Sequence, residues 1–218
     1  MGHHRAHHRT TSRHVVVRPR IPASLAELEA RGLRWGRMDG QQESFLKDEF
    51  FDFTIRGAFQ VRGGSNIYDD KASSKEKEEF RDALRLSLEQ LIPRYCAPVS
   101  EEDHIQNIVD LSEELSRKRA GVLKNKRFRI GIAQKALNLY LKYLWCLGKV
   151  PTPPHCPFDR NVIEELPNCS EINWTELDNP EGYRKLVAAA KEKAGTAPLA
   201  QWELELSNGH SPGSPAIK

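Results

Sequence analysis

The fold of this chain is decided by one stretch of sequence, RIGIAQKALNLYLKYLWCLGKVPTPPHCPFDRNVI at residues 129–163. Its first half carries apolar side chains at helical spacing on nearly every face. The apolar positions are Ile130, Ala133, Ala136, Leu137, Tyr140, Leu141, Leu144, Trp145 and Leu147. A helix that is apolar on most sides is a central one, and the stretch therefore predicts a central helix in an all-α protein.

Four polar residues interrupt this helix, namely Gln134, Lys135, Asn138 and Lys142. Residues three and four apart are neighbours on a helix surface, so the four form a single narrow stripe. On an otherwise apolar helix, such a stripe must face water, a partner or a cavity. The four residues are therefore candidate contacts for a ligand.

The second half of the stretch returns the chain toward this helix. Gly148 ends the helix, and three prolines within residues 151–154 prevent its continuation. Asp159 then stands where an N-cap is needed for a short helix at residues 160–166. We therefore expect Asp159 to lie near the helix that carries Lys135.

The chain length of 218 residues favours one domain with a single core. We expect a basic, disordered arm at residues 1–20, a helical domain at 21–195 and a flexible tail at 196–218. The arm carries five arginines and no acid, so its own positive charge exceeds the net charge of +3 of the whole chain. The basic balance of the protein therefore belongs to the arm.

The cysteines and the hydropathy indicate a cytoplasmic protein. The four cysteines have no paired spacing, and the spacing Cys146, His155, Cys156, Cys169 is unlike that of a zinc site. We therefore expect no metal and no cofactor. The sequence has no run of about 18 apolar residues and no apolar signal core near residue 1, so we expect no membrane association.

Other segments complete a helical domain. Helical spacing predicts a short helix at residues 22–32, a longer one from Ser74 to the break at Pro93, and a last one at 180–193. A further helix starts at Ser100, which forms a capping-box-like pair with Asp103.

Two segments between these helices leave alternatives open. The loop at residues 57–74 contains Gly63 and Gly64 but lacks the Gly-Lys-Ser/Thr ending of a P-loop, so we interpret it as a turn before a helix. The aromatic segment from Phe45 to Phe59 fits a helix or a strand equally well. This segment is a candidate core element or an interface for a homodimer or another protein.

A basic tract precedes the Lys135 helix, with seven cations in thirteen residues and no acid. Its members are Arg117, Lys118, Arg119, Lys124, Lys126, Arg127 and Arg129. Such a patch attracts phosphates because binding releases counterions. A solvated helix end, favoured by the helix dipole, is the alternative interpretation.

Lys135 and Asp159 form a candidate chemical pair. A lysine amine attacks a sugar carbon only when it is neutral, and the apolar surroundings of the helix disfavour the ammonium form. A nearby aspartate stabilises the cationic sugar that develops as a base departs, and it accepts protons during Schiff-base formation. The pair therefore points to chemistry on a nucleic acid.

Two motifs in this stretch resemble the signature of helix-hairpin-helix DNA glycosylases. They are GIAQKALN at residues 131–138 and CPFDRNV at 156–162. The family has a glycine-containing turn that opens a lysine-bearing helix, followed by a Pro-x-Asp-x-x-Val segment. In this sequence Ala133 stands at the position of the family's second hairpin glycine.

The resemblance implies an all-α glycosylase that excises a damaged base flipped from duplex DNA. Lys135 would be the nucleophile of a combined glycosylase and abasic-site lyase, and Asp159 its acidic partner. Arg127, Arg129 and the amides near Gly131 would hold phosphates. The remaining cations of the basic tract, together with Gln134, Asn138, Lys142 and His155, are further candidate nucleic-acid contacts.

Two other functions fit the same residues. One is a helical domain that binds nucleic acid without catalysis and uses Lys135 as a phosphate contact. The other is a protein-interaction domain, of a mobile-element or defence system, that uses the segment from Phe45 to Phe59. The glycosylase hypothesis predicts that the Lys135 ammonium and the Asp159 carboxylate lie within roughly 6 Å in one cleft.

Overall fold

The computed structural model describes residues 39–59 and 67–209, and the regular elements there are helical. The α-helices are α2 (Gly40–Phe59), α3 (Ser74–Leu91), α4 (Glu101–Arg119), α5 (Ile130–Cys146), α6 (Arg160–Glu164), α7 (Pro180–Ala194) and α8 (Leu199–Ser207). Three short 3-10 helices, η1 (Ile92–Tyr95), η2 (Ala120–Val122) and η3 (Lys124–Lys126), connect them. The all-α prediction is confirmed for this part of the chain.

Some predictions fall on other residues. The basic arm at residues 1–20, the helix at 22–32 and the pair Gly63 and Gly64 lie outside the described residues. Within the described ranges, no helix combines the length and apolar character that a membrane span requires.

Capping residues fix the helix starts that the sequence predicted. Ser73 forms a full capping box with Glu76 at the start of α3, and Ser100 accepts a hydrogen bond from the Asp103 amide at the start of α4. The predicted break at Pro93 is also confirmed, since α3 ends just before it and η1 begins.

The aromatic segment proves to be helical, which settles the alternative between helix and strand. In α2 the buried residues are Phe51, Thr54, Ile55 and Ala58, which share one helical face. Phe50 stacks on Tyr143 of α5 with ring centroids 5.2 Å apart. A Cβ at Gly57 would lie 2.7 Å from the Leu139 side chain, so the two helices approach closely there.

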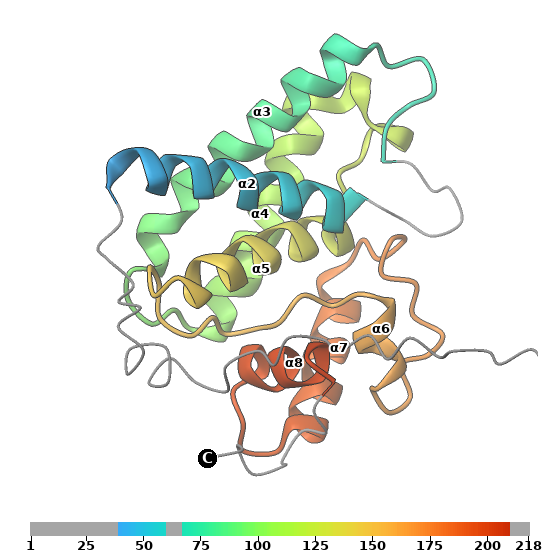
Figure 1. The fold of residues 1–218 in the computed structure, drawn as a ribbon. Coiled ribbons are helices and arrows are strands. Elements are labelled where there is room, and N and C mark those ends of the chain that lie inside the picture. The colour runs from blue at the N-terminus through green and yellow to red at the C-terminus, as the bar shows by residue number, and fades with distance from the viewer. Residues whose placement is uncertain (1–38, 60–66, 210–218) are drawn as a thin grey trace, which may run out of the picture. The chain divides into compact units, whose positions relative to one another are not determined.

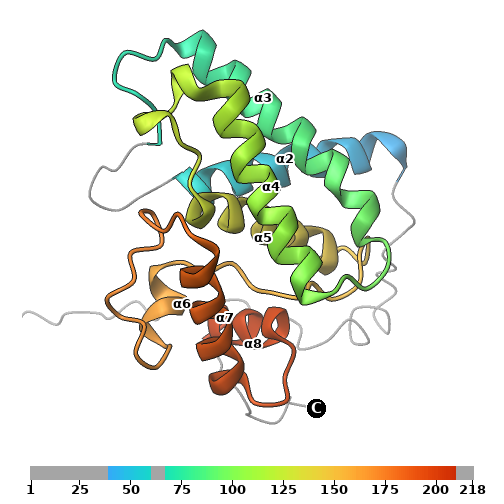
Figure 2. The same cartoon turned by 180° about the vertical axis from the view of Figure 1, so that it is seen from behind.

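Helix α5 is the centre of the described fold. Both views show it between the helices α2 to α4 and the segment that carries α6 to α8 (Figures 1 and 2). Its buried residues include Gly131, Ile132, Ala133 and Leu137, and the three consecutive positions among them point in different directions around the helix. This arrangement confirms the prediction of a central helix.

The last helix corrects the predicted domain boundary. We expected a flexible tail from residue 196, but α8 forms at Leu199–Ser207 and buries Leu199 and Trp202. The reason is an apolar face within LAQWELEL that packs on the domain, together with Glu203, which pairs with Lys142 of α5 at 2.7 Å. The helical domain therefore continues beyond residue 195.

Helix α8 should contribute measurably to stability. Trp202 is only 1% exposed, so Trp202→Ala should lower the free energy of unfolding by about 3–5 kcal/mol through lost burial and a residual cavity. Exposed Gln201→Ala is the matched control, with an expected change within about 0.5 kcal/mol. Urea unfolding followed by circular dichroism measures both, and equal stability of the two variants would contradict the packed helix.

Candidate functional site

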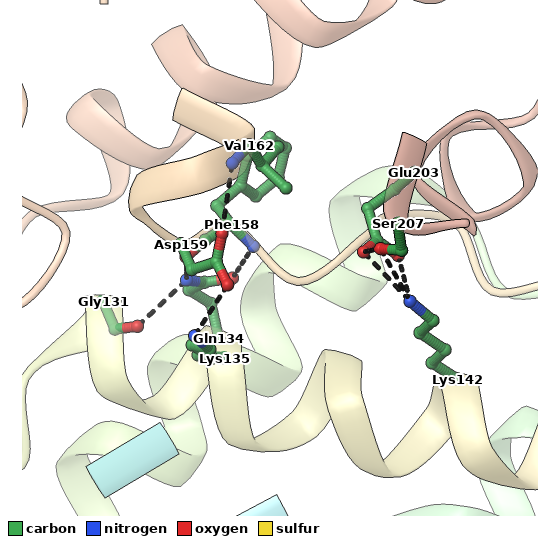
Figure 3. Close-up of polar contacts among 9 residues, drawn as sticks. All are labelled: Gly131, Gln134, Lys135, Lys142, Phe158, Asp159, Val162, Glu203 and Ser207. Atoms are coloured by element: carbon green, nitrogen blue, oxygen red, sulfur yellow. Dashed lines mark hydrogen bonds and ion pairs between the residues drawn. The ribbon is translucent and has the colours of Figure 1, made fainter. Parts of the chain in front are cut away.

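Lys135 and Asp159 meet where α5 passes the start of α6. The Lys135 Nζ lies 3.0 Å from the Asp159 Oδ2 (Figure 3), so the expected proximity is confirmed. The Lys135 side chain is 9% exposed and that of Asp159 31% exposed. The ring of Trp174 covers the ammonium, with its centroid 4.6 Å from Nζ. The pair is thus enclosed on the lysine side and open to solvent at the carboxylate.

Asp159 has two structural tasks at once. Its Oδ1 accepts a hydrogen bond from the Val162 amide at 3.1 Å, which makes it the N-cap of α6, and its Oδ2 faces Lys135. One carboxylate therefore both starts α6 and ties it to α5.

Gln134 holds the chain immediately before Asp159. Its Nε2 donates to the Phe158 carbonyl at 2.7 Å, and its Oε1 accepts from the Phe158 amide at 3.1 Å (Figure 3). The side chain is fully buried. Gln134 is therefore a positioning residue for Asp159, and its amide is not accessible to DNA in this structure.

Asn138 and His155 belong to a buried polar network. The Asn138 Nδ2 donates to the Cys156 carbonyl at 2.9 Å and to the Tyr183 hydroxyl at 3.2 Å, while its Oδ1 lies 2.8 Å from the His104 Nε2. The His155 Nδ1 lies 2.8 Å from the same Tyr183 hydroxyl. Both predicted nucleic-acid contacts are 1% exposed, so neither side chain reaches a surface ligand.

Lys142, the last residue of the polar stripe, pairs with the C-terminal helix. Its Nζ lies 2.7 and 2.9 Å from the two carboxylate oxygens of Glu203 (Figure 3). Both side chains are largely buried, at 14% and 6% exposure. The stripe on α5 therefore faces the protein's own C-terminal segment instead of water, a ligand or a cavity.

The basic tract divides into paired and free cations. Arg127 contacts Asp178 at 2.9 Å, and Arg129 contacts Glu176 at 3.0 Å. On the side of α4, Lys118 pairs with Glu114 and Arg119 with Glu79. Over the described ranges, the exposed cations Arg117, Lys124 and Lys126 make no ion pair. These three cations remain candidate phosphate contacts.

A small pocket lies between the basic tract and the start of α5. Lys124, Arg127, Arg129 and Ile132 contribute to its wall. Ile132 stands three residues before Lys135, which places the pocket about one turn from the candidate pair. Neither Lys135 nor Asp159 lines this pocket.

The first amides of α5 are occupied by the segment at residues 174–178. The Gly131 amide donates to the Leu177 carbonyl at 2.8 Å, and the Ile130 amide to the Asp178 Oδ1 at 3.3 Å. A Cβ at Gly131 would lie 1.7 Å from the Trp174 carbonyl oxygen. Gly131 is therefore required for contact with this segment, and its amide is not free for a phosphate in this structure.

The two buried histidines are held in the neutral form. Their rings meet edge to face with centroids 4.7 Å apart. Burial lowers the pKa of both His104 and His155 from 6.5 to about 3, and the proximity of the His155 ring adds to the effect on His104. The His155 Nε2 lies 3.6 Å from a Glu101 carboxylate oxygen, which is beyond hydrogen-bond distance.

The cysteines of the described region are all free. Cys96 and Cys146 are exposed, whereas Cys156 and Cys169 are buried. Among the residues with described positions, no three His, Cys, Asp or Glu side chains are grouped closely enough to hold a metal ion.

Comparison of the chain with protein-family models, with curated protein sequences and with solved structures gave no match in any of the three.

Sequence reasoning missed the partners of the predicted residues. Trp174, Asp178 and Glu203 complete the surroundings of Lys135, Arg127 and Lys142 from distant parts of the chain. The apolar pattern around Trp202 was the one signal that could have placed α8, and hence Glu203, in the domain. For Trp174 and Asp178, the sequence offers no local pattern that identifies these contacts.

Gly131→Ala should displace the segment at residues 174–178, because the new methyl group and the Trp174 carbonyl cannot occupy the same space. We expect a loss of at least about 2–3 kcal/mol in unfolding free energy. Gly121→Ala is the control, since a Cβ there meets nothing within 4 Å. Tryptophan fluorescence and thermal unfolding compare the two, and a Gly131→Ala protein as stable as the control would refute the close approach.

The histidine pair should make the fold acid-sensitive. Because the folded pKa values of about 3 lie below the unfolded value of 6.5, the unfolded chain binds more protons as the pH falls. Stability should be constant above pH 7 and decrease by up to about 4 kcal/mol between pH 7 and 5. Urea unfolding across this range measures the loss, which should be about half as large in His155→Gln; a flat profile would contradict the prediction.

Proposed function

We propose that this protein is a DNA base-excision enzyme, an N-glycosylase with abasic-site lyase activity through a Schiff base on Lys135. The observation that carries the proposal is the contact of the Lys135 amine with the Asp159 carboxylate at 3.0 Å, in surroundings that exclude water from the amine. A nearly buried amine beside a partly exposed carboxylate is the pair of groups that this chemistry uses.

The chemistry begins with a proton transfer. The observed contacts of Lys135, the ion pair with Asp159 and the Trp174 ring, are contacts of the ammonium form. Attack on the sugar requires the neutral amine, so a proton must leave Nζ first, and Asp159 is the adjacent acceptor. The Asp159 carboxylate is also the exposed member of the pair, so the substrate approaches from its side.

The Lys135 nitrogen forms a bond to C1′ of the sugar, and the C1′–base bond breaks with its electron pair leaving on the base, which takes up a proton. The C1′–O4′ bond then breaks as one proton passes from the attached nitrogen to O4′, which opens the sugar ring and yields the protonated Schiff base. Loss of a C2′ proton expels the 3′ phosphate, and water finally releases Lys135.

The charge distribution supports a nucleic-acid substrate. Lys124, Arg127 and Arg129 surround the pocket beside the first turns of α5. Arg117 and Lys126 are exposed and make no ion pair with any described residue. The unpaired cations Arg117, Lys124 and Lys126 would strengthen DNA binding in proportion to the counterions they release.

Borohydride trapping tests the proposal on duplex and single-stranded oligonucleotides that carry an abasic site or an oxidised purine. We expect a covalent protein–DNA adduct in the unaltered chain and at least a hundredfold less in Lys135→Gln, because the imine that borohydride reduces would form on the Lys135 amine. Asp159→Asn should lower the trapping rate by about 10²–10⁴ through loss of the proton acceptor.

Lys142→Gln is the matched control. Lys142 lies on the same helix and also makes a buried ion pair, with Glu203, so it reproduces the structural effect of removing a buried lysine. Its adduct yield should match that of the natural chain at a temperature where all variants are folded. Equal loss in both lysine variants, or no adduct in the natural chain, would overturn the proposal.

A second function is favoured by the internal contacts of Lys135. Asp159 and Trp174 satisfy this lysine within the protein, as expected for a domain that binds nucleic acid without catalysis. Salt-dependent DNA binding without an adduct would support this function.

A protein-binding role is supported by Phe45 and Phe53 on α2, which are 62% and 42% exposed.

A further inference from the structure

We infer that residues 174–178 form an acidic latch, in which Glu176 and Asp178 occupy the phosphate positions of the basic pocket while Trp174 covers Lys135. The inference rests on the proposed function for its substrate, DNA, and adds the regulation of that site. This short segment contacts both the first turns of α5 and the arginines before it.

Asp178 has the contacts of a bound phosphate. Its two oxygens lie 3.0 and 2.9 Å from the Arg127 Nε, and Oδ1 also accepts the Ile130 amide at 3.3 Å. A guanidinium together with an amide at a helix N-terminus is a donor set that phosphate oxygens use. The protein therefore supplies its own anion at this position.

Glu176 neutralises the second arginine of the pocket. It contacts the Arg129 guanidinium at 3.0 Å, and the same guanidinium donates to the Thr175 carbonyl at 3.1 Å. Both arginines that line the pocket are thus held by one segment of five residues. Lys124, which lines the same pocket and makes no ion pair among the described residues, remains open for a first phosphate contact.

The acidic and the apolar residues of the segment differ in how readily a bound phosphate can displace them. The side chains of Glu176 and Asp178 are 52% and 34% exposed, so their ion pairs are surface pairs that contribute little to stability. Trp174 and Leu177 are buried, at 6% and 8% exposure, and anchor the segment. DNA phosphates can therefore replace the carboxylates first, while movement of Trp174 from Lys135 needs the additional contacts of a bound substrate.

The latch predicts that removal of its charges strengthens DNA binding. For the full chain carrying Asp178→Asn and Glu176→Gln, we expect a Kd about tenfold lower on a labelled duplex with a tetrahydrofuran abasic-site analogue. The slope of log K against log salt should steepen by about one to two, because each released arginine gains a phosphate. Fluorescence anisotropy between 50 and 300 mM salt measures both quantities.

A matched control separates the latch from a general gain in charge. Glu192→Gln with Glu205→Gln removes two acids from α7 and α8, away from the pocket, and changes the net charge equally. This control should leave Kd within about twofold. Adding Arg127→Gln to the latch variant should cancel most of its gain, because Arg127 is the group that Asp178 holds.

Each outcome separates the latch from the proposed function. Tighter binding by the latch variant without any borohydride adduct would uphold the latch and reject the catalytic proposal. An adduct in the natural chain with unchanged Kd in the latch variant would do the reverse. An equal gain in the control, a gain that survives Arg127→Gln, or no DNA binding by any variant would overturn the latch.

Discussion

The described fold depends on one constraint. Four polar side chains on a buried helix must each find a hydrogen-bond or ion-pair partner. Gln134, Lys135, Asn138 and Lys142 stand on α5, where an unpaired donor would cost about 1–3 kcal/mol and an unpaired charge more. The C-terminal segment supplies those partners as backbone groups of Phe158 and Cys156 and as two carboxylates. Each polar contact therefore fixes one part of that segment against α5, and its register along the helix follows.

The candidate site is a product of the same contacts. Gln134 fixes Phe158, Phe158 precedes Asp159, and Asp159 both caps α6 and receives the Lys135 ammonium. The positioning of the candidate pair and the stability of the domain thus use the same hydrogen bonds. A variant that breaks these hydrogen bonds can therefore lose activity because it unfolds. Lys142 is the informative comparison, since it is a second buried lysine on the same helix.

Local sequence patterns predicted the helices and their ends, because spacing and capping are local interactions. Helical spacing and capping residues identified α3 to α7, and the return of the chain at Asp159 predicted its proximity to Lys135. The partners of the stripe were not predictable, because Glu203 stands 61 residues after Lys142 and no local pattern encodes that contact. An isolated polar stripe suggests a ligand face, whereas a distant segment of the same chain can satisfy the same groups.

The position of the acids beside the basic tract connects stability with binding. Arg127 and Arg129 pair with Asp178 and Glu176, so a phosphate that takes either arginine must displace a carboxylate of the protein. By linkage, the binding free energy that any polyanion gains from these arginines is reduced by the free energy that the internal ion pairs lose. The segment at residues 174–178 also covers Lys135 through Trp174, so the same segment contacts both arginines and the amine. Under the proposed function, this one segment would connect the folding of the chain, the binding of a polyanion and the access to the buried lysine.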